Sequence, residues 1–279
     1  MAKRVGDRLR LPQGPVDVGA LATDTTPGFK GGKRLGRESL QSLAPTLSDL
    51  QERLFAEGVT GGKRSLLLVL QGMDTSGKGG TLRHSVGLVD PQGVDIRSFK
   101  APTEEEKRHD FLWRIRQALP SPGYLGIFDR SHYEDVLIVR VHGLVPRSTW
   151  ARRYAAINRF EEQLTAAGTT IVKCFLHISK KEQKRRLLAR LDDPTKHWKY
   201  SPADVDERAR WDAYHEAYQA VLEKTNTAHA PWYVVPSDHK WYRNWAITNL
   251  LIEHLRDLDP QWPAAGFDVV AERERLAAT

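Results

Sequence analysis

A glycine-rich segment at residues 72–81, Gly-Met-Asp-Thr-Ser-Gly-Lys-Gly-Gly-Thr, constrains the fold of this chain more than any other feature. Gly72, Gly77 and Lys78 fit the G-x-x-x-x-G-K frame, in which backbone N–H groups and a lysine bind phosphate oxygens. The apolar run 66–70 precedes the frame, and a segment that can form a helix follows it. A strand, a phosphate-binding loop and a helix in this order predict an α/β domain that binds phosphoanhydrides.

The frame departs from its usual form at one position. A Ser or Thr normally follows the lysine, and its hydroxyl binds Mg²⁺, but this chain has Gly79 there. The loop also carries an acid, Asp74, and removing water from a carboxylate beside bound phosphates is costly unless a cation lies between them. We therefore predict that Asp74 binds Mg²⁺, directly or through water. The alternative is a structural glycine-rich turn without a ligand.

A second cluster, Asp-Arg-Ser-His-Tyr-Glu-Asp at 129–135, follows the predicted strand 124–128. An acid at the end of a buried strand, in a chain with a phosphate-binding loop, is placed to hold Mg²⁺ opposite the phosphates. Asp129 is therefore the second metal candidate, and Arg130 is placed to reach a transferred or acceptor phosphate. The alternatives are a helix N-terminal acid for Asp129 and a structural ion pair for Arg130.

Three nearby residues have two interpretations each. Ser131 followed by Glu134 forms a capping box, so Glu134 is either a helix cap or a functional acid. His132 is either a packed histidine or a catalytic one. Lys100, which follows the predicted strand 94–99, is either a phosphate contact or a solvated lysine.

The balance of charge points to an anionic partner. The net charge is +7 and the pI is about 9.5. Basic residues are concentrated in the segment 173–199, where Lys180, Lys181 and Lys184 fit a solvated helix face. Arg186 and Arg190 are spaced i, i+4 and share one side of a helix, which suits phosphate recognition by two guanidinium groups.

The chain reads as one α/β domain with two extensions. We predict a basic, flexible N-terminal arm at 1–35, a single domain at 36–258 and a C-terminal tail at 259–279. Predicted strands at 66–70, 94–99, 124–128, 169–178 and 232–235 are separated by helices, including those expected at 46–57, 103–119, 202–224 and 240–255. This alternation predicts a parallel sheet covered on both sides, with ligands at the carboxyl ends of the strands.

Other features concern the compartment. No apolar run approaches the roughly 18 residues of a membrane span, and the basic N-terminus lacks the apolar block of a signal peptide. The single cysteine, Cys174, lies in an apolar stretch and is expected to be a small buried residue of a strand. We therefore expect a cytoplasmic protein without a membrane partner.

Taken together, these segments resemble the polyphosphate kinase 2 family. The resemblance rests on the loop 72–81, the segment Phe-Lys-Ala-Pro-Thr at 99–103 and the cluster 129–135. The segment 179–199 resembles the family's lid through Gln183, Arg186, Arg190, Asp193-Pro194 and Trp198-Lys199. The C-terminal part of the family is matched by Trp232-Tyr233 and by Lys-Trp-Tyr-Arg-Asn at 240–244.

The resemblance implies an α/β P-loop kinase fold that is thymidylate-kinase-like, with a parallel sheet flanked by helices and a helical lid at about 179–205. It implies transfer of phosphoryl groups between inorganic polyphosphate and nucleotides with Mg²⁺, or alternatively Mn²⁺. The Ser-His-Tyr-Glu-Asp variant resembles the class III branch, whose members phosphorylate AMP to ADP as well as ADP to ATP. A homo-oligomer is also implied.

The same resemblance assigns roles to residues. Asp74 and Asp129 would organise Mg²⁺, and Arg130, Arg186 and Arg190 would neutralise charge on the transferred group. Glu134 would tune the acceptor site. The residues expected to hold phosphate are Lys78, Lys100 and the loop positions Gly72, Ser76, Gly77, Gly79, Gly80 and Thr81.

Two other functions compete with this interpretation. One is an ATP-dependent nucleoside or nucleotide kinase, because Asp129-Arg130 also resembles acceptor motifs there. The other is a P-loop switch or nucleic-acid-binding protein. The sequence contains no Asn-Lys-x-Asp guanine-reading motif and no basic-aromatic pattern of a single-strand-binding platform, so no specific nucleic acid is expected.

Overall fold

The computed structural model describes residues 4–279, and its centre is a five-stranded parallel sheet with the strand order β2-β3-β1-β4-β5. The strands are β1 (Ser65–Gln71), β2 (Val94–Ser98), β3 (Leu125–Asp129), β4 (Thr169–His177) and β5 (Trp232–Pro236). All five predicted strands are present. Because β1 lies at the centre and is buried along its whole length, it reads as a continuous apolar run rather than as an alternating one.

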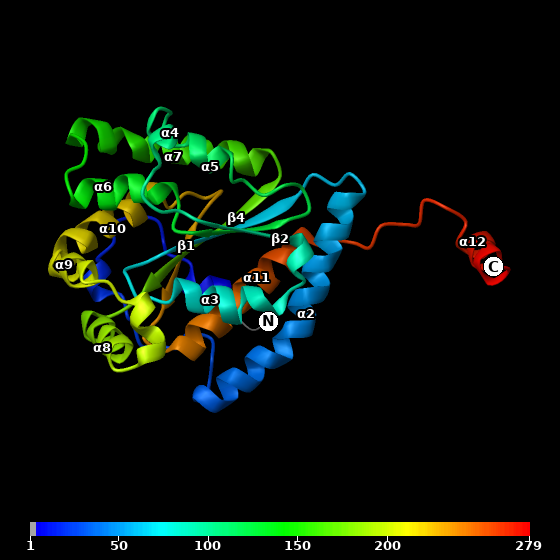
Figure 1. The fold of residues 1–279 in the computed structure, drawn as a ribbon, viewed down its shortest axis with the longest axis horizontal. Helices are drawn as coiled ribbons and strands as arrows, with labels where there is room; N and C mark the ends of the chain where they lie inside the picture. The colour runs from blue at the N-terminus through cyan, green and yellow to red at the C-terminus, as the bar shows by residue number, and fades with distance from the viewer. Residues whose placement is uncertain (1–3) are drawn as a thin grey trace.

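Helices cover both faces of the sheet (Figure 1). Alternate side chains of β1 point to opposite faces, so Leu66 and Leu68 pack in one core with α2 and α11. Leu67 and Val69 pack in a second core with α7 and α10. The fold class is therefore confirmed as a parallel α/β sheet flanked by helices.

The helices run in chain order between and beyond the strands. They are α1 (Val5–Leu9), α2 (Lys33–Val59), α3 (Lys78–His84), α4 (Glu104–Lys107), α5 (Trp113–Arg116), α6 (Ile138–Val141), α7 (Arg147–Ala166), α8 (Lys180–Leu191), α9 (Ala203–Ala209), α10 (Trp211–Thr225), α11 (Lys240–Leu258) and α12 (Val269–Ala277). Short 3₁₀ turns lie at Val18–Ala20, Val86–Leu88, Pro91–Gly93, His132–Val136 and Pro194–Lys199.

The N-terminal segment differs from the predicted flexible arm. Residues 1–3 of that prediction lie outside the described residues, but from Val5 onward the segment is packed. Val5 and Leu9 join the core beside α11, whereas Val18 joins the core on the other face. The backbone N–H groups of Val5 and Gly6 each donate to the Glu253 carboxylate of α11 at 2.8 Å. A composition rich in Gly, Pro, Lys and Arg suggested disorder, but a few well-spaced apolar side chains are enough to fix the segment.

Several helix boundaries also differ from the predictions. The helix expected at 103–119 is divided into α4 and α5, because Asp110 accepts a hydrogen bond from the backbone N–H of Leu112 (2.9 Å) and starts a new turn. The capping box of Thr103 and Glu106 is confirmed. Helix α2 begins far upstream of the predicted helix 46–57. It contains Pro45, the residue just before the predicted start.

Two further differences concern a helix that was not predicted and a predicted helix that is divided in the structure. The segment 202–224 is divided into α9 and α10 at Arg210, and α7 was not predicted. The C-terminal tail contains the short helix α12. None of the helices within residues 4–279 is long and apolar enough to cross a membrane.

Candidate active site

The phosphate-binding loop connects β1 to α3 at the carboxyl end of the sheet, next to the end of β3. The Lys78 ammonium group donates to the backbone carbonyl of Gly72 at 2.8 Å, so the lysine curls back over its own loop. Burial lowers the pKa of Lys78, and the negative charges of Asp74, Asp129 and Glu134 oppose this effect. Three acids predicted from two motifs, the loop 72–81 and the cluster 129–135, are thus close enough to act on one lysine.

The glycines of the loop differ in whether the surrounding structure requires a residue without a side chain. Gly77 has a φ of +116°, and a Cβ atom there would lie 1.7 Å from Nη1 of Arg243. At Gly80 a Cβ atom would lie 2.6 Å from Nη2 of the same arginine. By contrast, Gly79 is exposed, and a Cβ atom there would have no neighbour within 4 Å. The missing hydroxyl at Gly79 is therefore not a consequence of crowding.

Arg243 of α11 extends to the loop and leaves no room for a side chain at Gly77 or Gly80. Its Nη1 donates to the backbone carbonyl of Ser76 at 3.2 Å, and its other donors bind the Asn244 side chain. Burial and the positive charge of Arg186 lower the pKa of Arg243 to about 9. Sequence reasoning assigned this residue to the family's C-terminal part without giving it a role.

Asp74 and Arg130 form an ion pair across the site. Nη2 of Arg130 donates to Oδ1 of Asp74 at 3.1 Å, and the remaining guanidinium N–H groups of Arg130 find no partner among residues 4–279. Burial acts to lower the pKa of Arg130, but the charges of Glu134 and Asp74 raise it overall. Arg130 also has a φ of +65°, a strained conformation that non-glycine residues adopt at functional sites. The structural ion pair is present, and free donors remain for a phosphate.

Asp129 ends β3 with one of its carboxylate oxygens unused. Oδ2 accepts from the Ser98 hydroxyl at 3.4 Å, whereas Oδ1 is buried and has no hydrogen-bond partner among the described residues. The cap of the following turn is Ser131, not Asp129, which disfavours the alternative of a helix N-terminal acid. A buried carboxylate oxygen without a hydrogen-bond partner is suited to bind a cation that enters the site together with the substrates.

The donor set as a whole also fits Mg²⁺. Across residues 4–279 no group of three or more His, Cys, Asp or Glu side chains is arranged to hold a metal ion. Mg²⁺ keeps several waters and is usually bound by one or two carboxylates together with substrate phosphates. Asp129 and Asp74 satisfy that requirement.

Glu134 is not a helix cap in the structure. Its backbone N–H donates to the carbonyl of Ser131 (3.1 Å), but its carboxylate does not reach back to the N–H of Ser131. With the Gln71 amide oriented to satisfy both neighbours, Gln71 donates to the Glu134 carboxylate (3.1 Å) and accepts from the Ser131 N–H (3.0 Å). Burial raises the pKa of Glu134, while Arg130 and Lys78 act to lower it. The capping alternative is therefore disfavoured.

Arg186 does not have the free guanidinium group that a phosphate ligand needs. Its side chain is 5% exposed, and Nε donates to the Glu182 carboxylate at 2.8 Å. The other four N–H groups are taken by backbone carbonyls of the loops after β1 and β5, namely Thr75, Ser76, Ser237 and Asp238. The i, i+4 spacing gave the correct helix face, but it could not show that this face packs against two loops.

The other basic candidates keep free donors. Arg190 uses Nη1 for the Lys199 carbonyl (2.7 Å) and for Asp204 (3.3 Å), both within the predicted lid. Lys100 is exposed, and its backbone carbonyl accepts from Arg114 at 2.8 Å. Neither side chain is brought into contact with Lys78 or Asp74.

Similarity to known proteins identifies the family of this chain. The family model described as polyphosphate kinase 2 matches residues 31–263. An AMP/ADP-polyphosphate phosphotransferase of Meiothermus ruber is 48% identical over 90% of this chain and 93% of its own length. The chain belongs to the polyphosphate kinase 2 family. An ADP-polyphosphate phosphotransferase of Rhodopseudomonas palustris, another relative, is 42% identical over 89% of this chain and 88% of its own length.

A solved structure supports the fold of this polyphosphate kinase 2 family member. The crystal structure of polyphosphate kinase 2 from Arthrobacter aurescens TC1 superposes with a TM-score of 0.96 at 53% identity. The match covers the whole of this chain and 98% of the other chain. The resemblance predicted from the motifs is thus confirmed at the level of family and fold.

Sequence reasoning missed a buried polar network behind the segment that carries Arg130 and Glu134. Lys173 of β4 is completely buried, and its ammonium group donates to Glu161 (2.6 Å), the Tyr133 hydroxyl (2.9 Å) and the Thr225 carbonyl (2.8 Å). The Tyr133 hydroxyl in turn donates to Glu161 at 2.7 Å. Lys173 therefore does not belong to the basic surface with which its sequence position grouped it. A lysine between apolar neighbours in a central strand was the signal available.

Glu161 of α7 is the centre of this network. Burial acts to raise its pKa, but the charge of Lys173 and the contact with His132 lower it overall. Nε2 of His132 lies 3.3 Å from Oε1 of Glu161, and both side chains are buried. His132 is thus a packed residue in the structure, and its network anchors Tyr133 between the two functional candidates Arg130 and Glu134.

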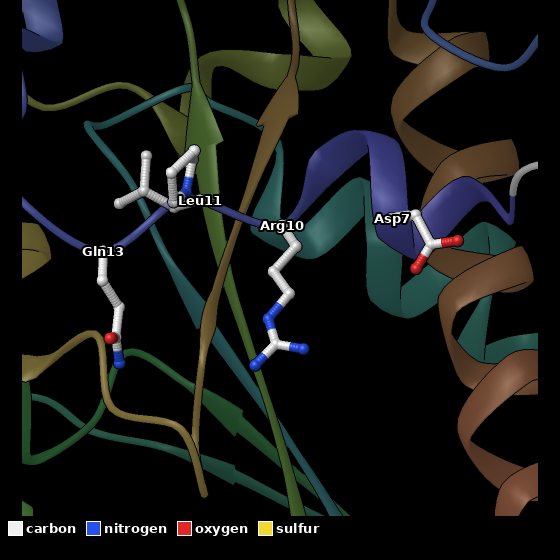
Figure 2. Close-up of a pocket in the computed structure, with 5 residues that line it drawn as sticks. Asp7, Arg10, Leu11 and Gln13 are labelled. Atoms are coloured by element: carbon white, nitrogen blue, oxygen red, sulfur yellow. The ribbon is translucent and has the colours of Figure 1, made fainter.

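A cavity elsewhere in the molecule contains none of the predicted site residues. Its volume is about 370 Å³, and it is lined by Asp7, Arg10, Leu11, Pro12 and Gln13. Figure 2 shows that this lining belongs to the N-terminal segment where it crosses β5, and Arg10 forms an isolated antiparallel bridge with Tyr233 there. We assign no part of the reaction to this cavity.

Proposed function

We propose that this protein transfers phosphoryl groups between inorganic polyphosphate and the adenine nucleotides AMP and ADP. The observation that carries the proposal is the convergence of Lys78, Asp74, Asp129, Arg130 and Glu134 at the ends of β1 and β3. The likeness to a phosphotransferase named for both AMP and ADP supports the choice of substrates.

In this proposal the terminal phosphoryl group of polyphosphate moves to the phosphate oxygen of the nucleotide. The bond to the bridging oxygen of the donor breaks, and the shortened chain keeps that oxygen and its negative charge. The new bond joins the transferred phosphorus to an α-phosphate oxygen of AMP or a β-phosphate oxygen of ADP. Because the transition state of phosphoryl transfer is loose, positioning and charge neutralisation provide most of the catalysis.

Each residue has a role in this scheme. Lys78 and the backbone N–H groups of the loop bind the reacting phosphates, and Arg130 neutralises charge through its free donors. Asp129 and Asp74 hold Mg²⁺, which would supply further neutralisation of the phosphate oxygens when bound. Glu134, fixed by Gln71, borders the acceptor site. We leave Arg186 out of this list because its donors are occupied.

An ATP-dependent nucleotide kinase is the second candidate, and a donor comparison separates the two. Purified protein is incubated with Mg²⁺ and AMP or ADP, with either long-chain polyphosphate or ATP as donor, and nucleotides are quantified by ion-exchange chromatography. We expect ADP and ATP to form with polyphosphate. Product formation with ATP as the only effective donor would reject the polyphosphate proposal.

The Lys78→Ala variant tests whether this loop is the catalytic site. The lysine is the main cation of the phosphate cradle, so we expect turnover to fall by about 10³-fold or more. The Lys78 side chain donates only to Gly72, so the melting temperature should stay close to that of the native protein. Retained turnover would place the reaction elsewhere. The variant Lys63→Ala, at an exposed lysine just before β1 and at the end of that strand opposite the loop, is the matched control.

A further inference from the structure

Tyr218 of α10 lies next to the candidate active site. It belongs to the hydrophobic core that α7 and α10 form with one face of the sheet, and its ring packs on the ring of Phe175 with the centroids 4.7 Å apart. Phe175 of β4 lies opposite Gln71 of β1 in the register of the sheet, and Gly72 of the phosphate-binding loop comes next in the chain. The tyrosine ring is therefore fixed beside the end of β1 from which the phosphate-binding loop departs.

The hydroxyl of Tyr218 is available to a ligand. The residue is only 4% exposed, and its hydroxyl forms no hydrogen bond within residues 4–279, although it is not enclosed as the hydroxyl of Tyr154 is. One turn earlier on α10, the hydroxyl of Tyr214 donates to Glu207 at 2.5 Å. Because a buried tyrosine usually finds a hydrogen-bond partner, an accessible hydroxyl on a packed ring indicates a partner that enters from outside.

The surroundings of this hydroxyl are the charged groups of the candidate active site. Burial and then the negative charges of Glu134 and Asp74 raise the pKa of Tyr218 well above its ordinary value, while the charge of Arg130 opposes this effect. The phenol is therefore protonated at neutral pH and can donate a hydrogen bond. Gln71, at the end of β1, donates to the Glu134 carboxylate at 3.1 Å. The tyrosine thus lies on the side of the site that Glu134 borders.

We propose that the Tyr218 hydroxyl donates a hydrogen bond to the phosphate group of the nucleotide that receives the phosphoryl group, an inference that rests on the proposed function. That group is the α-phosphate of AMP or the β-phosphate of ADP. Arg130 supplies positive charge there through its free donors. The phenol adds a neutral donor at a position that the packed ring fixes, which holds the attacking oxygen in place.

The test compares the native protein with Tyr218→Phe, which removes the hydroxyl and keeps the ring. Isothermal titration calorimetry measures the Kd of AMP, of ADP and of tripolyphosphate as a short donor analogue, each with Mg²⁺ and without a second substrate. Because a hydrogen bond to a charged group is lost, we expect the Kd of both nucleotides to rise about tenfold to a hundredfold. The Kd of tripolyphosphate should stay the same. The melting temperature should not fall, since the replacement removes no hydrogen bond within the protein.

The matched control is Tyr154→Phe. It removes the hydroxyl of another tyrosine in the same core, but that hydroxyl is enclosed, and its charged neighbour is Arg140 rather than an acid of the site. We expect the control to bind both nucleotides as the native protein does. An equal loss of nucleotide affinity in the two variants would show that the effect comes from the core and not from a contact with the ligand, and it would overturn the inference.

The remaining outcomes separate this inference from the proposed function. If the native protein binds both nucleotides and Tyr218→Phe binds them equally well, the role of Tyr218 is overturned and the proposed function is not. A higher Kd for tripolyphosphate with unchanged nucleotide affinity would place the hydroxyl on the donor side, which also contradicts the inference. A native protein that binds neither AMP nor ADP would overturn the proposed function and this inference together.

Discussion

At the scale of single residues, Gly79 shows that the usual hydroxyl of a phosphate-binding loop can be absent where space for it exists. A Cβ atom at this position would meet nothing within 4 Å. The proposed metal ligands Asp74 and Asp129 explain why no hydroxyl is needed, since two carboxylates are sufficient for Mg²⁺.

Comparison of Gly79→Ser with Gly79→Ala tests this explanation. Both replacements remove a glycine from the first turn of α3, so we expect a melting temperature equal to or slightly above that of the native protein. We also expect the two variants to need the same Mg²⁺ concentration for half-maximal turnover, because the metal is held by the acids. A lower requirement in the serine variant alone would show that the native site lacks a ligand that the hydroxyl supplies.

His177, at the end of β4, makes stability depend on pH. Burial and the nearby His215 lower its pKa from 6.5 to about 4, whereas the unfolded chain binds the proton at the ordinary value. The unfolded state therefore binds more protons between these two values, and the free energy of unfolding falls as the pH decreases from about 6.5 to about 4. The contribution of this residue is on the order of 3 kcal/mol.

The measurement is the denaturant midpoint of the native protein and of His177→Gln at several pH values. The glutamine can still donate toward the Leu21 carbonyl that the histidine contacts at 3.1 Å, but it does not titrate. We expect a shallower decline in the variant. Identical pH profiles for the two proteins would contradict the assignment to His177.

Residue identities could be predicted where a motif fixes both chemistry and position. Lys78, Asp74 and Asp129 follow from a loop frame and from the end of a strand, and the structure brings them together. Arg186 shows the limit of such reasoning. Helical spacing identifies the face on which a side chain lies, but four of the five hydrogen-bond partners of Arg186 come from loops more than 50 and more than 100 residues away.

At the scale of elements, the buried pair of Lys173 and Glu161 connects β4 and α7 to the turn that carries Tyr133. Its energetic value is separable from its effect on the site. Removing one partner leaves a buried charge unpaired, whereas removing both can leave stability unchanged.

We predict that Lys173→Met lowers the free energy of unfolding by about 3–5 kcal/mol. The double variant Lys173→Met/Glu161→Leu should recover much of that stability but not turnover, because the Tyr133 hydroxyl then loses its acceptor. Denaturant unfolding and kcat are measured on the same preparations. Recovery of kcat together with stability in the double variant would show that the network only stabilises the fold and does not position Arg130 and Glu134.

Strands were easier to predict than helices, and the reason is physical. Each strand is a short apolar run between two polar loops, as Leu66–Leu70 illustrates, and burial on both faces makes the run continuous. Helix ends depend on local hydrogen bonds that compete with the hydrophobic pattern. Asp110 ends one predicted helix by binding the backbone of Leu112, while Pro45 is accommodated inside α2 despite its missing N–H group.

At the scale of the whole molecule, the net charge of +7 predicts how substrate binding depends on salt. A long polyanion releases counterions from many sites when it binds, whereas a nucleotide releases few. With saturating Mg²⁺, raising NaCl from about 50 to about 200 mM should increase the KM for long-chain polyphosphate several-fold and that for ADP much less. Equal salt dependence for the two substrates would contradict an extended polyphosphate-binding surface.

The architecture was predictable from the order of strands and helices, but the paths of the two chain ends were not. The N-terminal segment adds Val5 and Leu9 to the core beside α11, although its composition resembles that of a disordered arm. The C-terminal tail carries a helix that no part of its own body covers. The contacts that fix the N-terminal segment are with residues far away in the sequence, which a local pattern does not describe.

The five hydrogen bonds of Arg186 have a consequence for motion in this kinase fold. Four of them join α8 to the loops after β1 and β5, so the first two turns of the predicted lid are held against the phosphate-binding loop. Any closure over the substrates must pivot beyond that point, around residues 191–202. In that case α8 would stay in place and only the segment after it would move. Arg190, at the end of α8, contacts this segment through the Lys199 carbonyl and Asp204.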